Sequence, residues 1–258
     1  MTAAAIEASG LGKDFGSIRA LDGLDLEVRE GEFFGCLGPN GAGKTTTVHL
    51  FATLLAPSRG TARVAGHDVR ADGLAVRRSI GLVFQEPTLD RELTVEENLR
   101  FAARLWNLPA RVAEPRIAAL LGQFGLDQRR RNPVRTLSGG LRRALDVARG
   151  LLHQPRILFL DEPTAGLDPR ARRSLWDLIR GLRAASGLTL FLTTHYVEEA
   201  EPCDRVAVLD QGRLAAIGVP ADLKREANVE SLEQVFLTRT GRRLAETGAG
   251  AGAGAVTE

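Results

Sequence analysis

The sequence predicts an α/β fold of the doubly wound type, in which helices cover both faces of a largely parallel sheet. Short apolar runs with β-branched residues alternate along the chain with longer segments of helical period. The run Ile157-Leu-Phe-Leu160 is apolar throughout, as expected for a strand that is buried on both faces of a sheet. Another apolar run, Phe33–Leu37, leads through a glycine-rich turn directly into a helical segment, and such strand–turn–helix units build parallel sheets.

Eight strands are expected from these runs and from the turn residues beside them. The last two meet across Asp210-Gln211-Gly212, a turn typical of a hairpin, and the earliest strands are expected to form a small antiparallel sheet of their own. The predicted strands are residues 24–28, 33–37, 61–64, 80–84, 157–160, 188–193, 206–209 and 213–217.

Helical period dominates between Gln85 and Gln154, so an α-helical subdomain is predicted to be inserted into the sheet domain there. Pro169 suits the first turn of a helix, and Pro155 ends the helix before it. The predicted helices are residues 44–55, 95–105, 111–124, 139–153, 169–185 and 232–237.

The same patterns divide the chain. Residues 1–220 are expected to form the main domain, with the helical insertion at about residues 86–154. The pattern weakens after Pro220, which predicts a C-terminal extension at residues 221–245. Residues 246–258 are rich in Gly and Ala, and since such a segment builds no core, it is predicted to be a disordered tail.

Composition restricts the function. The chain has 258 residues, enough for one large domain that needs no disulfide or metal to fold, and Cys36 and Cys203 are expected to be buried, reduced thiols. Lys and Arg total 34 and Asp and Glu total 32, so the net charge of +2 gives no general attraction to nucleic acid. The run at residues 129–131, three arginines, is expected to be a solvated face. The longest apolar stretches are far shorter than the roughly 20 residues of a membrane span, and no signal peptide is expected.

A glycine-rich motif follows the strand predicted at residues 33–37. Residues 38–45 fit G-x-x-x-x-G-K-[ST], whose backbone N–H groups surround phosphate oxygens while the next helix adds its dipole. Lys44 is expected to reach the β- and γ-phosphates of ATP, and the Thr45 hydroxyl to bind Mg²⁺. A turn without a ligand is the competing interpretation, which the flanking strand and helix disfavour. The residues expected to contact the nucleotide are Gly38, Pro39, Asn40, Gly41, Ala42, Gly43, Lys44, Thr45 and Thr46.

Two acids end the apolar strand predicted at residues 157–160. In a parallel sheet the carboxyl end of this strand lies beside the phosphate-binding loop, so Asp161 and Glu162 are expected to face the nucleotide. Asp161 is the expected Mg²⁺ partner, and Glu162 the general base that polarises the attacking water. The alternative, a solvated acidic pair, requires its position beside the loop to be a coincidence.

Five further segments resemble one family. Thr136-Leu-Ser-Gly-Gly140 opens a helix of the predicted insertion and resembles the LSGG signature of the ATP-binding-cassette (ABC) ATPases. The resemblance covers about residues 5–220, with two departures. Leu141 stands where many relatives carry Gln, and Phe15 replaces a more common Tyr. The other matching positions, in family terms, are Gln85 (Q-loop), residues 165–168 (D-loop), His195 (switch histidine) and Phe15 (the aromatic that stacks on adenine).

The resemblance implies a P-loop NTPase (RecA-like) ABC ATPase core with a small antiparallel β-subdomain and an inserted α-helical subdomain. It implies a head-to-tail homodimer, in which each ATP is bound by the phosphate-binding loop of one subunit and, in trans, by Ser138, Gly139, Gly140 and Asp168 of the other. His195 is implied to contact the γ-phosphate, and Gln85 to couple Mg²⁺ to movement of the helical subdomain. The implied catalytic residues are Lys44, Gln85, Glu162 and His195, and the implied Mg²⁺ ligands are Thr45, Gln85 and Asp161.

Residues 161–169, 193–200 and 231–244 resemble the daunorubicin-resistance type of ABC-2 export ATPase. That branch implies a separate membrane-spanning permease, a place on the cytoplasmic face of a bacterial-type cell membrane, and a cargo such as a drug, lipid or polysaccharide that the ATPase subunit does not touch. Two other functions stay open. One is a soluble ABC ATPase that acts on ribosomes or DNA, and the other is a phosphotransferase that uses the same loop. Trp106, Leu105 and Leu108 are expected either to line the groove for the permease or to pack in the core.

Overall fold

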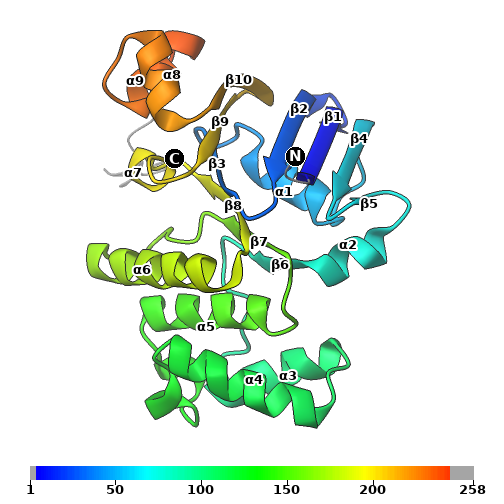
Figure 1. Ribbon diagram of the computed structural model, residues 1–258, viewed down its shortest axis with the longest axis vertical. Coiled ribbons are helices and arrows are strands. Elements are labelled where there is room, and N and C mark those ends of the chain that lie inside the picture. The colour runs from blue at the N-terminus through cyan, green and yellow to red at the C-terminus, as the bar shows by residue number, and fades with distance from the viewer. Residues whose placement is uncertain (1–3, 245–258) are drawn as a thin grey trace, which may run out of the picture.

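The computed structural model describes residues 4–244, apart from the side chains of residues 184–186, and contains two sheets with helices around them (Figure 1). The larger sheet has the strand order β10-β9-β3-β8-β7-β6. Each neighbouring pair is parallel except the β9–β10 hairpin. Its strands are β3 (Phe33–Leu37), β6 (Ile80–Val83), β7 (Ile157–Asp161), β8 (Thr189–Thr194), β9 (Arg205–Asp210) and β10 (Arg213–Gly218).

The smaller sheet is antiparallel, as the early strands predicted, with the order β2-β1-β4-β5. Its first strand is absent from the prediction. This strand contains Gly10 and Gly12, and its pairing with β2 shifts register several times, so its side chains do not alternate between buried and exposed. The strands are β1 (Ala4–Phe15), β2 (Ile18–Arg29), β4 (Arg59–Val64) and β5 (His67–Asp68).

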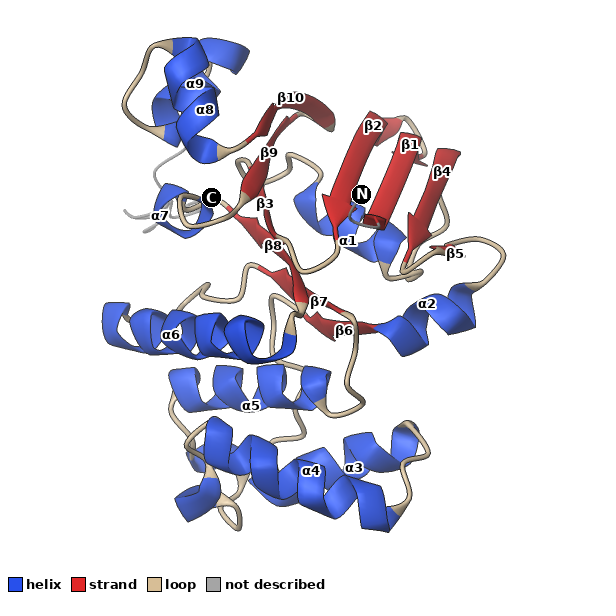
Figure 2. Ribbon diagram, viewed as in Figure 1, coloured by secondary structure: helices blue, strands red, loops and turns tan. Residues whose placement is uncertain are grey.

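Helices gather on the side of the larger sheet away from the antiparallel one, where α3 to α6 lie (Figure 2). The helices α3, α4 and α5 lie in sequence between β6 and β7. The helices of the described residues are α1 (Lys44–Phe51), α2 (Gly73–Ser79), α3 (Val95–Leu105), α4 (Ala110–Gln123), α5 (Gly139–Leu151), α6 (Pro169–Ser186), α7 (Val197–Ala200), α8 (Pro220–Ala227) and α9 (Leu232–Thr240), with 3-10 turns at Asp127–Arg129 and Val134–Thr136.

Local signals explain which helix boundaries are correct. The helix α3 has the predicted bounds, and its start is explained by the reciprocal capping box that Thr94 and Glu97 form. The helix α1 ends earlier than predicted, at Phe51, and Thr53 just beyond it has a positive φ of 61° that no helix continues. The short helices α2, α7 and α8 are absent from the prediction because four to eight residues show little periodicity.

The core lies in two layers, one on each face of the larger sheet. Alternate residues of β7 enter different layers: Leu158 and Leu160 pack toward the helices, and Phe159 packs toward the antiparallel sheet. There the Phe159 and Phe191 rings lie 5.5 Å apart, and Phe51 meets Phe191 edge-on at 5.7 Å. These buried rings hold α1 against β7 and β8, which positions the loop before α1.

The predicted fold class is therefore confirmed in its arrangement, whereas the domain boundaries drawn from the sequence stay a prediction. The tail predicted at residues 246–258 lies outside the described residues. Cys36 and Cys203 are buried free thiols, as predicted, and burial raises the pKa of Cys36 to about 12. None of the helices within residues 4–244 combines the length and apolarity that a bilayer span requires.

Candidate nucleotide-binding and catalytic site

Four parallel strands end at one edge of the larger sheet, and the loops that follow them form the candidate site. Leu37 of β3 pairs with Thr194 of β8, and Asp161 of β7 pairs with Thr193. Val83 of β6 pairs with the residue before Asp161. Because the register places these strand ends side by side, the motifs that follow them converge although they lie far apart in sequence.

The loop after β3 is shaped to bind an anion. Gly41 and Gly43 have φ values of 78° and 101°, which residues with a Cβ rarely adopt, and a Cβ on Gly41 would meet open space within 4 Å. The helix α1 that follows has no side-chain cap and no acid in its first turn. Its first N–H groups are therefore free to bind phosphate oxygens, and this part of the site fits the phosphates of a nucleoside triphosphate.

Lys44 is the buried cation of this loop, with only 4% of its surface exposed. Its Nζ lies 2.9 Å from the carbonyl oxygen of Gly38 and 3.0 Å from that of Pro39, and both bonds curl the loop around it. The third contact of Nζ is with Glu162 Oε1 at 3.1 Å. A buried ammonium and carboxylate in contact offset each other's desolvation, so each holds the other in the site.

The Thr45 hydroxyl donates to Asp161 Oδ1 over 3.2 Å, so two of the three residues expected to bind Mg²⁺ are neighbours. Asp161 is 1% exposed and also accepts a hydrogen bond from Thr193 Oγ1. Among the described residues no group of three or more His, Cys, Asp or Glu side chains gathers as a metal site. One carboxylate and one hydroxyl beside a phosphate loop suit Mg²⁺, which takes most of its ligands from substrate phosphates and water.

Glu162 lies at the centre of the predicted catalytic residues. Gln85 Nε2 is 3.4 Å from Glu162 Oε2, and His195 Nδ1 is 3.1 Å from the same oxygen. The other ring nitrogen of His195, Nε2, is buried and has no hydrogen-bond partner among the described residues. A buried polar atom without a partner is costly, and its position suits a group supplied by a ligand.

Glu162 has a backbone φ of 43°, which is rare for a residue with a side chain. Its N–H donates to the carbonyl and hydroxyl oxygens of Thr193, at 3.1 Å each, and these bonds hold it there. Strained conformations of this kind cost about 1–3 kcal/mol and persist where the surrounding contacts impose them.

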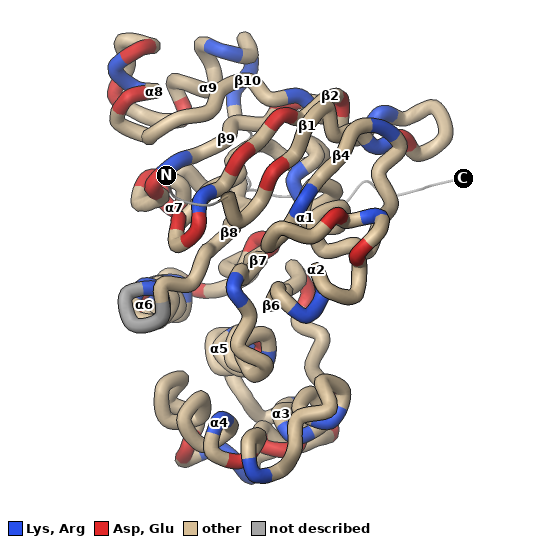
Figure 3. The backbone as a smooth tube through the Cα atoms, turned by 45° about the vertical axis from the view of Figure 1, so that its right-hand side comes forward, with Lys and Arg blue, Asp and Glu red and all other residues tan. Residues whose placement is uncertain are grey.

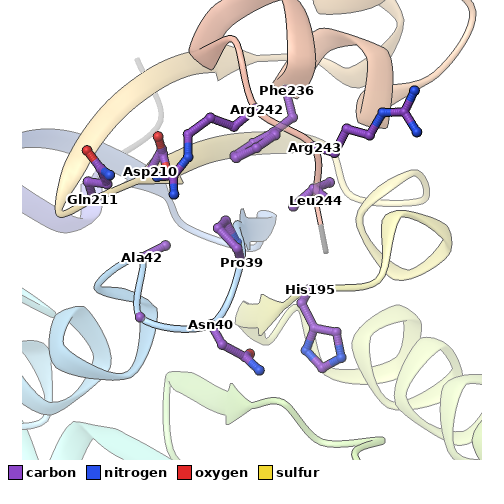
Figure 4. A pocket seen from close by; sticks show the side chains of 11 residues that line it. Pro39, Asn40, Ala42, His195, Asp210, Gln211, Phe236, Arg242, Arg243 and Leu244 are labelled. Carbon is purple, nitrogen blue, oxygen red and sulfur yellow. The ribbon is translucent and has the colours of Figure 1, made fainter. Parts of the chain in front are cut away.

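A cavity of about 390 Å³ lies over the outer side of the loop. Asn40 and His195 lie beside each other along one edge, while Phe236, Arg242 and Leu244 close the opposite side (Figure 4). The predicted C-terminal extension thus returns to the nucleotide site, which the sequence does not indicate. Arg242 Nη1 lies 3.5 Å from Asp210 Oδ1, and this pair anchors the returning segment to the β9–β10 turn.

Five predicted positions lie outside this cluster, namely Phe15 and the four residues that are expected to act in trans. Phe15 ends β1 and is 45% exposed, with Lys13 Nζ 5.1 Å from its ring centre. Ser138 is exposed and caps α5, since its hydroxyl accepts from the Leu141 N–H at 3.4 Å. Asp168 is exposed and caps α6 through the N–H groups of Arg170 and Ala171, both 2.9 Å away.

Ser138, Gly140 and Asp168 line a second cavity of about 300 Å³, separate from the one beside His195. A Cβ on Gly139 would lie 3.6 Å from Leu167 Cδ2, which is an ordinary van der Waals contact. The four residues predicted to act in trans are thus brought together, beside a cavity that differs from the one lined by the phosphate-binding loop.

Two residues with clear contacts to the site are absent from the prediction. Thr193 binds both Asp161 and the N–H of Glu162. Arg143 of α5 is 2% exposed and donates to the carbonyl oxygens of Phe84 and Gln85, so it ties the signature helix to the Q-loop. Burial lowers the pKa of Arg143, with Asp146 opposing the shift. Arg143 is missed because a charged residue on an amphipathic helix is expected at the surface. Thr193 is missed because the sequence does not show which residue a Thr in a strand binds.

The arginine run at residues 129–131 agrees with the solvated face that the sequence predicts. Arg130 Nη2 lies 2.6 Å from Glu96 Oε1, and this guanidinium lowers the pKa of Glu96. Positive and negative residues are interspersed on the helical layer and on the antiparallel sheet (Figure 3). Trp106 stacks on His153 with ring centres 4.0 Å apart, and Leu105 beside it is 68% exposed.

Known proteins are similar to this chain in sequence and in fold. The pattern of the ABC transporter family matches residues 21–165. The daunorubicin resistance ATP-binding protein DrrA3 of Streptomyces coeruleorubidus is 48% identical over 237 residues, which are 92% of this chain and 75% of that protein. The daunorubicin/doxorubicin resistance ATP-binding protein DrrA of Streptomyces peucetius is 49% identical over 221 residues, 85% of this chain and 67% of that one.

Among solved structures, the ATP-binding subunit of an ABC transporter superposes with a TM-score of 0.81 at 30% identity and covers 92% of this chain and 99% of its own. The ATP-binding cassette MJ0796, a dimer bound to ADP and Pi, superposes with a TM-score of 0.74 at 26% identity and covers 83% of this chain and 98% of its own. With its phosphate-binding loop, acidic strand end and signature helix in place, this chain belongs to the ABC transporter family, as an ATP-binding, ATP-hydrolysing domain with the ABC ATPase fold.

Proposed function

We propose that this chain is the ATP-hydrolysing subunit of an ABC-2-type export transporter, works as a homodimer, and drives a separate membrane-spanning permease from the cytoplasmic face of the membrane. The observation that carries the proposal is the pair of contacts at one sheet edge, Lys44 with Glu162 and Thr45 with Asp161. The export branch is supported by the two relatives named for daunorubicin resistance, so a drug is the favoured cargo over a lipid or polysaccharide.

Nucleotide binding is assigned to the phosphate-binding loop and to the polar side chains beside it. The N–H groups of the loop at residues 38–46 and the Lys44 ammonium bind the β- and γ-phosphates of ATP. A phosphate oxygen is a stronger acceptor than the carbonyls of Gly38 and Pro39 that Lys44 now contacts. Thr45, Asp161 and Gln85 would hold Mg²⁺, which would neutralise charge on the β- and γ-phosphates. Phe15 supplies an exposed ring for the adenine.

Hydrolysis transfers the γ-phosphoryl group to water, which gives ADP and phosphate. Glu162 accepts the proton that the attacking water loses, as its oxygens lie at the centre of the cluster. Lys44 must turn toward the phosphates for this, because its contact with Glu162 Oε1 occupies the base. His195, oriented by Glu162 through Nδ1, offers Nε2 to the γ-phosphate and stabilises the charge of the transition state.

The second half of each site comes from the partner subunit in this proposal. Ser138, Gly139 and Gly140 begin α5, and the N-terminus of this helix suits an anion as the loop before α1 does. The exposed side chains of Ser138 and Asp168 are available to another chain. ATP therefore joins two subunits, and hydrolysis releases them.

Replacement of Ser138 by Arg is expected to lower ATP hydrolysis by about 100-fold or more, because a bulky side chain then blocks the helix N-terminus that would bind the ATP of the partner subunit. ATP affinity is expected to change little, since the phosphate-binding loop is intact. Steady-state hydrolysis and equilibrium binding of ATP measure the two effects. Ser138→Ala is the control for stability, because it loses the same helix cap, worth about 1 kcal/mol. Wild-type turnover by Ser138→Arg contradicts the composite site and favours the phosphotransferase.

The transport assignment is tested by affinity purification of the chain from detergent-solubilised membranes of the native host. We expect recovery of one integral membrane protein in stoichiometric amount. The soluble ABC ATPase is the second candidate, and it predicts recovery of ribosomal proteins or DNA instead. A preparation that contains either of these and no membrane protein overturns the transport assignment while leaving the ATPase chemistry in place.

A further inference from the structure

Glu199 is a buried carboxylate that the proposed chemistry leaves unused. It belongs to the short helix α7 and is 3% exposed. Its Oε1 accepts hydrogen bonds from Thr164 Oγ1 and, over 3.4 Å, from Trp176 Nε1. Its Oε2 accepts from Thr194 Oγ1 over 2.7 Å. A buried carboxylate is expensive without partners, and here three donors satisfy it.

Two of these donors lie next to a group that the proposed mechanism requires, and the third belongs to a helix that begins at the D-loop. Thr164 follows the general base Glu162 by two residues, and Thr194 directly precedes the switch histidine His195. Trp176 lies on α6, the helix that Asp168 of the D-loop caps. Thr164 and Thr194 are each 1% exposed, so both hydroxyls are locked toward Glu199. The carboxylate thus joins the loop after β7, the end of β8 and the helix α6.

A second set of contacts connects Glu199 to the His195 ring. Arg172 Nε lies 4.0 Å from Glu199 Oε1, and the Arg172 guanidinium lies 4.2 Å from the centre of the Tyr196 ring. The Tyr196 and His195 rings are 4.0 Å apart. The Tyr196 N–H donates to Thr194 Oγ1 over 2.9 Å, so the same hydroxyl that binds Glu199 also turns the chain after His195.

We propose that Glu199 is a positioning residue, which sets the distance between the base Glu162 and the switch histidine His195 through Thr164 and Thr194. This inference rests on the proposed ATPase function. Glu199 is 3% exposed and its oxygens are bound by Thr164, Trp176 and Thr194, so it is expected to affect turnover and not ATP binding. A displacement of about 1 Å at reacting groups is enough to reduce turnover about 100-fold.

The test is Glu199→Gln, which keeps the side-chain volume but replaces one acceptor oxygen by an amide donor. We expect kcat to fall 10- to 100-fold, with KM and the Kd for ATP within about twofold of wild type. Glu201→Gln is the matched control. It removes a carboxylate two residues away that pairs with Lys224 at 2.7 Å on the surface, and its kcat is expected to stay within twofold of wild type.

Two further variants separate positioning from stability. Glu199→Asp keeps the carboxylate but shortens the side chain by one methylene. Its kcat is expected to stay at least fivefold below that of wild type, even if its midpoint of thermal unfolding equals that of wild type. Thr194→Val removes the hydroxyl that joins Glu199 to the chain before His195. In a double-mutant cycle its loss of kcat is expected not to add to the loss of kcat in Glu199→Gln. Non-additive losses at unchanged ATP stoichiometry support the proposal.

Wild-type kcat in both Glu199→Gln and Thr194→Val overturns the proposal. A loss of rate that matches the loss of ATP-binding-competent protein also overturns it, because the role is then purely structural. Wild type and Glu162→Gln are assayed beside these variants. If wild type hydrolyses no ATP, or Glu162→Gln turns over normally, the proposed function itself fails, and this outcome is distinct from normal turnover of the Glu199 variants alone.

Discussion

Glu162→Gln is expected to lower the rate of ATP hydrolysis by at least about 100-fold, the scale of a general base, while ATP remains bound. The amide has nearly the size of the carboxylate but takes no proton from water. It also removes the negative charge 3.1 Å from Lys44 Nζ, which frees the ammonium for the phosphates. The variant is therefore expected to accumulate as an ATP-bound dimer, visible by size-exclusion chromatography with Mg-ATP.

The control is Glu198→Gln, an exposed residue three positions after His195, which is expected to hydrolyse ATP at the wild-type rate. A Glu162→Gln protein that elutes only as a monomer under saturating Mg-ATP speaks against the composite site. Undiminished turnover removes Glu162 from the chemistry altogether.

Lys44→Ala is expected to weaken ATP binding by roughly 10- to 100-fold, since a charge-assisted phosphate contact contributes about 1.5–3 kcal/mol. The ATP-free protein is also expected to be less stable. Removal of one partner from a buried ion pair costs about 3–5 kcal/mol, because it leaves Glu162 charged and without its cation. Titration calorimetry measures the first effect and thermal unfolding without nucleotide measures the second.

The double variant Lys44→Ala/Glu162→Gln distinguishes these two effects. It leaves no uncompensated charge, so we expect it to regain much of the lost stability but none of the lost affinity. Lys224→Ala, which breaks a more exposed pair with Glu201, is the surface control and is expected to change stability by about 0–1 kcal/mol. Tight ATP binding by Lys44→Ala contradicts the role given to this residue.

The sequence alone determined the fold class and the parallel strands, and it indicated the residues that we propose to carry the chemistry. These features are local: an apolar run that continues into Gly38 and Lys44, or that ends in Asp161 and Glu162, carries its meaning within about ten residues. The start of α3 was likewise predictable, because the capping box of Thr94 and Glu97 is formed by neighbours in the chain.

The tertiary structure decided what depends on contacts between distant segments. The strand β1 has little strand character of its own, and its pairing on both sides with β2 and β4 makes it a strand. The return of Arg242 and Leu244 to the nucleotide site depends on how α8 and α9 pack. Neither feature has a local sequence signal.

The partners of buried polar side chains were also decided by the tertiary structure. The sequence shows Thr193 and Glu199 on either side of His195, but the register of β7 against β8 selects Asp161 as the partner of Thr193. The packing of α6 and α7 brings Thr164 and Trp176 to Glu199. Hydrogen bonds and ion pairs act over about 3 Å, and only the folded chain brings residues more than 20 positions apart to that distance.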